Sequence, residues 1–171
     1  MIQILIPTDF SVRSLHIVHD IVKRNEGQRI SIYVLHLVHI PNDISDLIFF
    51  RKSLLYNRVP VAFTEAMQML RNKYASQLKL ELHFSYGNHI KALNMTIESF
   101  GIDEIYSSGK HHYTLPLNNS VDIISMLPKC NIPVYKVGSK PAIETAEEAN
   151  MLSSLFSDDT SFSRTKPEAT F

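Results

Sequence analysis

The stretch "ILIPTDFS" (residues 4–11) joins two different hydrophobic patterns. The apolar run "IQILIP" (2–7) ends at a proline, as a short buried strand does. Beyond it, apolar residues recur at helical spacing in "SVRSLHIVHDIVKRN" (11–25), where Ser11 is a candidate helix cap and Gly27 closes the segment. A strand that passes directly into a helix is the first unit of an α/β domain.

The rest of the chain repeats this alternation. The segment "RISIYVLHLVHI" (29–40) is apolar on both faces, which is typical of a parallel strand covered on both sides. Further strands are predicted at 79–86, 103–109 and 132–137, and helices at 60–78, 89–100 and 119–130. Residues 41–59 are compatible with a helix but are left unassigned. The pattern predicts an α/β fold with a five-stranded parallel open sheet and helices on both faces.

The length and composition predict one domain followed by a tail. The 171 residues are enough for one substantial core, and we assign it to residues 1–138. Residues 139–171 are rich in Ser, Thr, Ala and Glu and carry six acidic residues against three basic ones. Such a segment buries little apolar surface, so we expect an acidic, flexible C-terminal tail.

Charge and cysteine content narrow the class of protein. Seventeen basic and seventeen acidic residues cancel, so the chain lacks the overall charge of a nucleic-acid binder. Cys130 is the only cysteine, which excludes an internal disulfide and is compatible with a reducing compartment. The N-terminal sequence has no signal-peptide pattern, and no segment has about 20 consecutive apolar residues. We therefore expect a soluble, cytoplasmic protein with no nucleic-acid or membrane partner.

The predicted topology locates a candidate site. In open parallel sheets, ligands bind beyond the carboxyl ends of the strands, where the strand order reverses. If the first and fourth strands flank that point, the loops at 7–11 and 108–120 converge there. The second loop leads into the predicted helix at 119–130, whose N-terminus would attract an anion. Asp9 could accept hydrogen bonds from a base or a ribose, or it could cap the first helix.

Five short blocks of the sequence resemble the universal stress protein family. They are "ILIPTDFS" (4–11), "VLHLV" (34–38), "YGNHIKAL" (86–93), "IDEIYSSG" (102–109) and "CNIPVYKV" (130–137). All five occur in the family's order and span about residues 1–138. The resemblance implies a Rossmann-like fold of the adenine-nucleotide-binding type, usually in a homodimer, and some members of the family bind ATP while others do not.

The resemblance also implies a set of nucleotide-binding residues. Asp9 matches the aspartate on the adenine side, and Leu37 matches the aliphatic residue near the base. The glycine-rich phosphate loop of binding members matches this chain only at its first glycine, Gly109. His112 stands at the second glycine, and Asn119–Ser120 stand at the final glycine and hydroxyl residue.

This loop is shorter than the family's by three residues, and Pro116 within it has no N–H to donate. Phosphate cradles need glycines, because these allow positive φ angles and let several N–H groups point at one anion. Lys110, His111 and His112 could supply side-chain donors instead, and a histidine pair would make anion binding sensitive to pH. ATP or another adenine nucleotide, another anionic ligand, or no small ligand all remain open.

Other histidines give weaker signals. His16 and His19 are three residues apart on a predicted helix, so they could share a metal ion, but the sequence offers no third ligand. His36 lies where the second strand of the family commonly carries a histidine, which implies a structural role. We expect no metal site and no catalytic residue.

Two functions follow from this reading. The first is a regulatory, stress-response protein of the universal stress type. It would form a homodimer through its last strand (132–137), at an otherwise open sheet edge, and act through a regulatory protein partner. The alternative is an enzyme of the same fold that hydrolyses a nucleotide or transfers a nucleotidyl group. Such an enzyme needs a complete phosphate site and an acid, base or metal, and the sequence shows neither.

Overall fold

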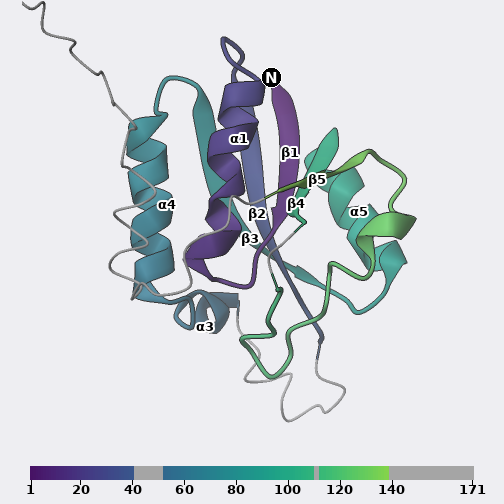
Figure 1. Cartoon of the computed structure of the whole chain (residues 1–171). Coiled ribbons are helices and arrows are strands. Elements are labelled where there is room, and N and C mark those ends of the chain that lie inside the picture. Colours follow the sequence, from purple (N-terminus) through teal and green to yellow (C-terminus); the bar gives the residue numbers. More distant parts are fainter. Residues whose placement is uncertain (41–51, 110–111, 139–171) are drawn as a thin grey trace, which may run out of the picture.

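Five parallel strands form one sheet in the computed structural model, which describes residues 1–40, 52–109 and 112–138. The strand order is β3-β2-β1-β4-β5, and every neighbouring pair is parallel. The strands are β1 (Ile2–Pro7), β2 (Ile30–Val38), β3 (Leu78–Tyr86), β4 (Glu104–Ser108) and β5 (Val134–Val137). The predicted α/β fold is confirmed: helices cover both faces of the open sheet (Figure 1).

The central strands explain why the sheet needs two covered faces. Ile4, Leu5 and Ile6 of β1 are consecutive and almost completely buried, and so are Val34 and Leu35 of β2. Consecutive residues of a strand point to opposite faces, so both faces must be shielded from water.

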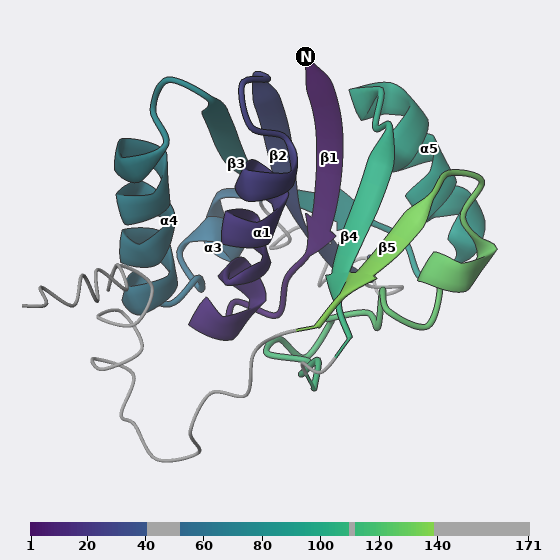
Figure 2. The same ribbon diagram turned by 45° about the horizontal axis from the view of Figure 1, so that its top comes forward.

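Two helical layers provide this cover, and Figure 2 shows them on opposite sides of the sheet. The helices are α1 (Ile17–Arg24), α3 (Lys52–Tyr56), α4 (Val61–Lys73) and α5 (Ile90–Phe100). Val18 of α1 and Phe63 of α4 belong to the core on one face, and Leu93 and Ile97 of α5 belong to the core on the other.

The strand order reverses between β1 and β4, because β2 continues the sheet on one side of β1 and β4 begins the other side. The loops that leave β1 and β4 therefore start at the same edge of the sheet. This is the crevice in which open α/β sheets bind their ligands, and its predicted position is confirmed.

The first predicted helix is divided in two. Val12–Leu15 form a 3-10 helix, η1, and α1 begins only at Ile17. The side chain of Ser14 is one cause, because its hydroxyl donates to the Ser11 carbonyl at 2.7 Å. Ser11 is the cap of η1, as expected, and its hydroxyl accepts from the Ser14 N–H.

The helix expected at 119–130 is wrong. This stretch contains turns and a 3-10 helix, η2 (Leu127–Lys129). The carboxylate of Asp122 accepts hydrogen bonds from the N–H groups of Ile124 and Ser125, and Pro128 cannot donate within a helix. As a result, no α-helix N-terminus in the described part of the chain follows β4 to attract an anion.

Two glycines fix the ends of neighbouring elements. Gly101 ends α5 in the left-handed region (φ 61°). Gly87 follows β3 with φ 137°, and a Cβ atom there would collide with the Cβ of Ala92. The turn into α5 therefore requires glycine.

Three segments lie outside the described residues: 41–51, 110–111 and 139–171. The unassigned stretch 41–59 is therefore described only from residue 52, where α3 begins. The acidic tail and the domain boundary near residue 138 stay predictions. Within the described ranges, no helix has the length and apolar character needed to cross a membrane.

Candidate functional site

The loop after β1 is buried and bonded to itself. Asp9 is only 3% exposed, and its Oδ1 accepts hydrogen bonds from the Ser11 N–H (3.1 Å) and the Ser11 hydroxyl (2.6 Å). The hydroxyl of Thr8 accepts from the Phe10 N–H at 3.0 Å. These side chains replace the backbone partners that a buried turn lacks.

Phe10 holds this turn in a conformation that non-glycine residues rarely adopt. Its φ is 61°, at a cost of about 1–2 kcal/mol. The ring packs against His36, Phe63 and Phe84, with centroids 4.3, 5.7 and 5.6 Å away. Burial of a phenylalanine contributes about 1.5–3 kcal/mol, enough to offset the backbone strain.

The second oxygen of Asp9 binds the loop after β4. Its Oδ2 accepts from both the N–H and the hydroxyl of Thr114, each at 3.1 Å. The loops after β1 and β4 therefore meet, as the topology predicted. Asp9, however, binds Thr114 across the crevice, and the cap of the first helical segment is Ser11.

We call residues 112–121 the crossing segment. It runs from the contact between Thr114 and Asp9 to the carboxyl end of β2. The Val121 N–H donates to the Leu37 carbonyl at 2.9 Å, and the His39 N–H donates to the Asn119 carbonyl at 2.7 Å. An antiparallel bridge pairs Val38 with Ser120. The crossing segment thus spans the carboxyl ends of the central strands and bonds to their backbone.

The side chain of His36 in β2 links the loop after β1 to the crossing segment. Its Nδ1 lies 2.6 Å from the Thr8 carbonyl oxygen, and its Nε2 lies 2.9 Å from the Ser120 hydroxyl. A carbonyl only accepts, so Nδ1 carries the proton and Nε2 accepts from Ser120. The Ser120 hydroxyl in turn accepts from the Leu117 N–H at 2.9 Å. This chain of bonds agrees with the structural role that the family resemblance implied for His36.

Tyr113 closes the remaining space. Its hydroxyl donates to the Thr8 carbonyl at 2.8 Å, beside His36. Burial raises the pKa of Tyr113, and the charges of Asp9 and Asp122 raise it further, so the phenol stays protonated and remains a donor. A cavity of about 10 Å³ is left between Pro7 and Tyr113, about enough for one water molecule.

Four of the predicted ligand residues lie at or beside the crossing segment, and their polar groups bond to other residues of the chain. Leu37 is fully buried in the core on the α5 face, and the amide of Asn119 donates to the His39 carbonyl at 3.3 Å. Ser120 bonds to His36, and Asp9 to Ser11 and Thr114. Binding of a ligand by these residues stays a prediction.

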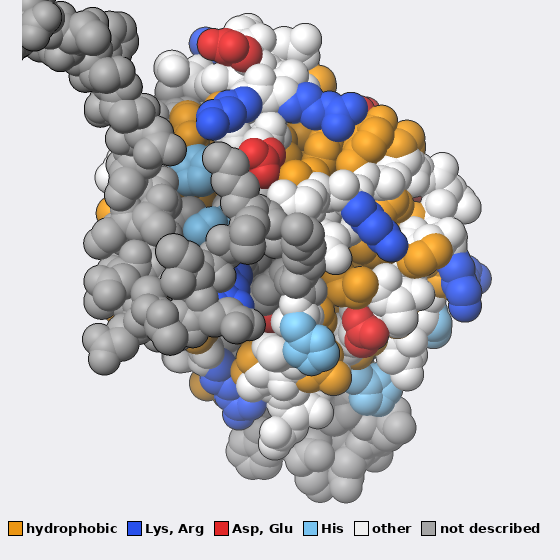
Figure 3. Space-filling model, in the orientation of Figure 1, with side chains coloured by type: hydrophobic (Ala, Val, Ile, Leu, Met, Phe, Trp, Pro, Cys, Tyr) orange, Lys and Arg blue, Asp and Glu red, His pale blue; other side chains and the backbone are white. Residues whose placement is uncertain are grey.

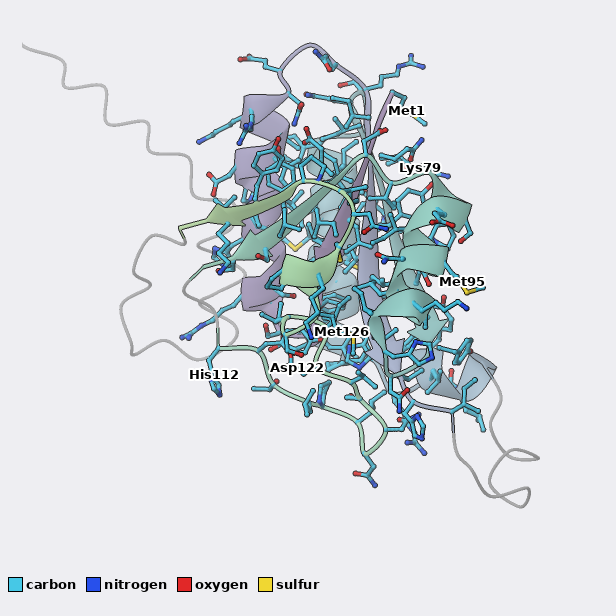
Figure 4. All side chains as sticks on the ribbon, turned by 90° about the vertical axis from the view of Figure 1, so that its right-hand side faces the viewer. Met1, Lys79, Met95, His112, Asp122 and Met126 are labelled. Carbon is cyan, nitrogen blue, oxygen red and sulfur yellow. The ribbon has the colours of Figure 1, made fainter. Side chains whose placement is uncertain are left out.

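Gly109 continues the sheet. Its N–H donates to the Val137 carbonyl at 2.8 Å, its φ lies outside the positive region, and a Cβ there would make only ordinary contacts. His112 is exposed and projects from the outside of the loop (Figure 4). Lys110 and His111 lie outside the described residues.

The second histidine of the pair His16 and His19 lies in α1 and contacts a tyrosine. The Nδ1 of His19 lies 2.6 Å from the Tyr74 hydroxyl. Among the described residues, no group of three or more His, Cys, Asp or Glu side chains is placed to hold a metal ion.

The neutral state of His36 gives a testable pH dependence. Burial lowers its pKa below the ordinary value of 6.5, although the bond to Thr8 and the charge of Asp9 oppose the shift. The unfolded chain therefore takes up this proton first as the pH falls. We expect the free energy of unfolding to decrease below about pH 6.5 and to stop decreasing once folded His36 is protonated.

Nitrogen-15 NMR of the histidine rings measures this directly. It should show the Nδ1–H tautomer of His36 and a pKa below 6.5. Ser120→Ala removes the bond to Nε2 that favours the neutral ring, so it should raise the pKa of His36. An Nε2–H tautomer, or a pKa at or above the ordinary value, would contradict the assigned bonds.

Comparisons with known proteins show the fold. No family model and no curated protein matches the sequence. Among solved structures, the chain is similar to the hypothetical protein MJ0577, at 18% identity and a TM-score of 0.53, over 82% of this chain and 98% of that one. It is also similar to the universal stress protein UspA from Lactobacillus plantarum, at 16% identity and a TM-score of 0.51, over 80% and 97%. A universal stress family protein from Burkholderia pseudomallei matches at 12% identity and a TM-score of 0.50, over 79% and 94%. The chain therefore has the fold of the universal stress proteins.

Proposed function

We propose that this chain is a regulatory protein of the universal stress type, and that it acts as a homodimeric binding module in the cytoplasm. Its output is contact with a regulatory protein partner, and it is not an enzyme. The shared fold and the order of the five sequence blocks support membership of the family. The observation that carries the proposal is the occupied crevice between β1 and β4.

A nucleotide and the crossing segment would compete for the same space. Ligand pockets commonly have volumes of roughly 300–1,000 Å³, whereas the cavity between Pro7 and Tyr113 has about 10 Å³. The oxygens of Asp9, which would meet a base or a ribose, already accept from Ser11 and Thr114. Binding of ATP or another adenine nucleotide would require Tyr113 and Thr114 to leave. We therefore infer that the closed form works without a nucleotide.

The contacts of the crevice also argue against the alternative function, an enzyme that acts on nucleotides. Nucleotide hydrolysis or transfer needs donors aimed at the phosphates, together with an acid, a base or a metal. Gly109 follows β4 directly and donates its N–H to the Val137 carbonyl, and Ser120 is bonded to His36. Neither residue is placed as a phosphate cradle would place it.

The two edges of the sheet differ, which supports dimerisation through β5. The Ile105 and Gly109 N–H groups donate to the Pro133 and Val137 carbonyls. Backbone groups alternate along a strand, so those of Val134 and Lys136 point to the open edge. At the opposite edge, Arg71 Nε donates to the Leu80 carbonyl at 2.8 Å and the Tyr56 hydroxyl to the Leu82 carbonyl at 3.2 Å. Side chains thus cap β3, and β5 is left to pair with a second copy.

The balanced net charge and the face shown in Figure 3 support a protein partner more than a nucleic acid. On the face shown in Figure 3, basic and acidic side chains are interspersed. A nucleic-acid interface would gather Lys and Arg on one face or along one helix.

Calorimetric titration tests the inferred state of the crevice. With ATP, ADP or AMP and magnesium, we expect no heat of binding and no thermal shift at millimolar ligand, because the crossing segment fills the crevice. Saturable one-to-one binding would contradict the closed crevice. ATP turnover that is lost in Asp9→Ala would favour the enzyme instead.

Sedimentation of the full chain tests the dimer. Lys136→Pro removes the outward N–H and should convert the dimer to a monomer, while the β4–β5 ladder keeps its bonds. Lys136→Ala loses the same charge but keeps the N–H, so it should remain a dimer. A monomeric parent chain, or a proline variant that stays dimeric, would contradict pairing through β5.

A further inference from the structure

A groove of about 450 Å³ lies at the edge of the sheet formed by β3, opposite β5. Val59, Met67 of α4 and Leu82 of β3 give it an apolar lining, and Tyr56 and Arg71 line it as well. Its volume falls within the range of roughly 300–1,000 Å³ that is typical of small-molecule sites. It is separate from the crevice between β1 and β4.

Arg71 lines this groove and brings a positive charge to its wall. Its Nε is fixed by the Leu80 carbonyl, so the plane of the guanidinium is held against the edge of β3. Guanidinium has five N–H donors, and the remaining four belong to the two Nη groups. Within the described ranges, neither an ion pair nor a further hydrogen bond engages them.

The acidic residue of the groove already has partners. Glu81 Oε2 lies 3.1 Å from Lys79 Nζ and 3.7 Å from His83 Nε2. Glu81 therefore pairs with Lys79 and not with Arg71. Of Glu81 and Lys79, only Glu81 lines the groove, so its carboxylate repels a doubly charged anion there more than a singly charged one.

We propose that this groove binds a small amphipathic carboxylate. The planar carboxylate pairs with the Nη groups of Arg71, since a guanidinium matches two oxygens with two parallel N–H donors. The apolar body of the ligand packs against Val59, Met67 and Leu82. The site goes beyond the proposed regulatory function and depends on neither the crevice nor the β5 edge.

Methionine methyl groups report on this groove directly. In the full chain labelled with methyl-¹³C methionine, we expect octanoate to shift the signal of Met67, which is 3% exposed and lines the groove. Met95 on α5 is 61% exposed and points away from the sheet (Figure 4), so its signal should not move. Octanamide has the same chain without the charge and should bind at least about tenfold more weakly.

Two further measurements test the role of Arg71 and the preference for a carboxylate over a phosphate. Arg71→Lys keeps the charge but loses the paired donors, so the affinity for octanoate should fall about tenfold. The methionine signals of the ligand-free variant report whether its fold is kept. Octyl phosphate should bind more weakly than octanoate because of Glu81.

Three results would overturn the proposal. The first is a Met67 signal that millimolar octanoate does not move. The second is equal binding of octanoate and octanamide, which would indicate apolar contact alone. The third is an unchanged affinity in a folded Arg71→Lys variant. If octyl phosphate bound more tightly than octanoate, the assigned class of anion would be wrong.

Discussion

The carboxylate of Asp9 joins the loops that leave β1 and β4, and the closed end of the sheet depends on this link. One oxygen accepts from Ser11 within its own loop, and the other accepts from Thr114 across the crevice. Hydrogen bonds to a charged group contribute more than neutral ones, about 1.5–3 kcal/mol each. His36 extends the link by binding both the Thr8 carbonyl and Ser120. The crossing segment is therefore part of the fold.

The sheet could be predicted from the sequence because buried parallel strands leave a local signal. Residues 2–7 and 29–40 are rich in apolar residues, so a parallel sheet covered on both sides followed from their pattern. The position of the crevice followed only on the condition that the first and fourth strands are neighbours, which the strand order confirms. The helix at 119–130 was predicted wrongly, because the local bonds of Asp122 and the effect of Pro128 outweigh the apolar pattern. The closure by Thr114 depends on a contact 105 residues away from Asp9 along the chain, and no local pattern reports such a contact.

Three regions of the sheet have different roles in this account. Among the described residues, Tyr113 and Thr114 cross the crevice, Tyr56 and Arg71 cap the β3 edge, and β5 forms the other edge. The shared fold alone does not fix which of these regions contacts another molecule. Where the family resemblance implies glycines, this chain has His112 and Asn119, which lack the backbone freedom that a phosphate loop uses.

Amide hydrogen exchange of the crossing segment measures whether it stays bonded across the crevice. The Thr114 and Val121 N–H groups donate to Asp9 and to the Leu37 carbonyl, although Thr114 lies in an exposed stretch. The account predicts that both exchange much more slowly than the same residues in an unstructured peptide, and that Asp9→Asn selectively speeds the exchange of Thr114. Exchange of both amides at the unprotected rate in the ligand-free parent chain would contradict it, because the crevice would then be open.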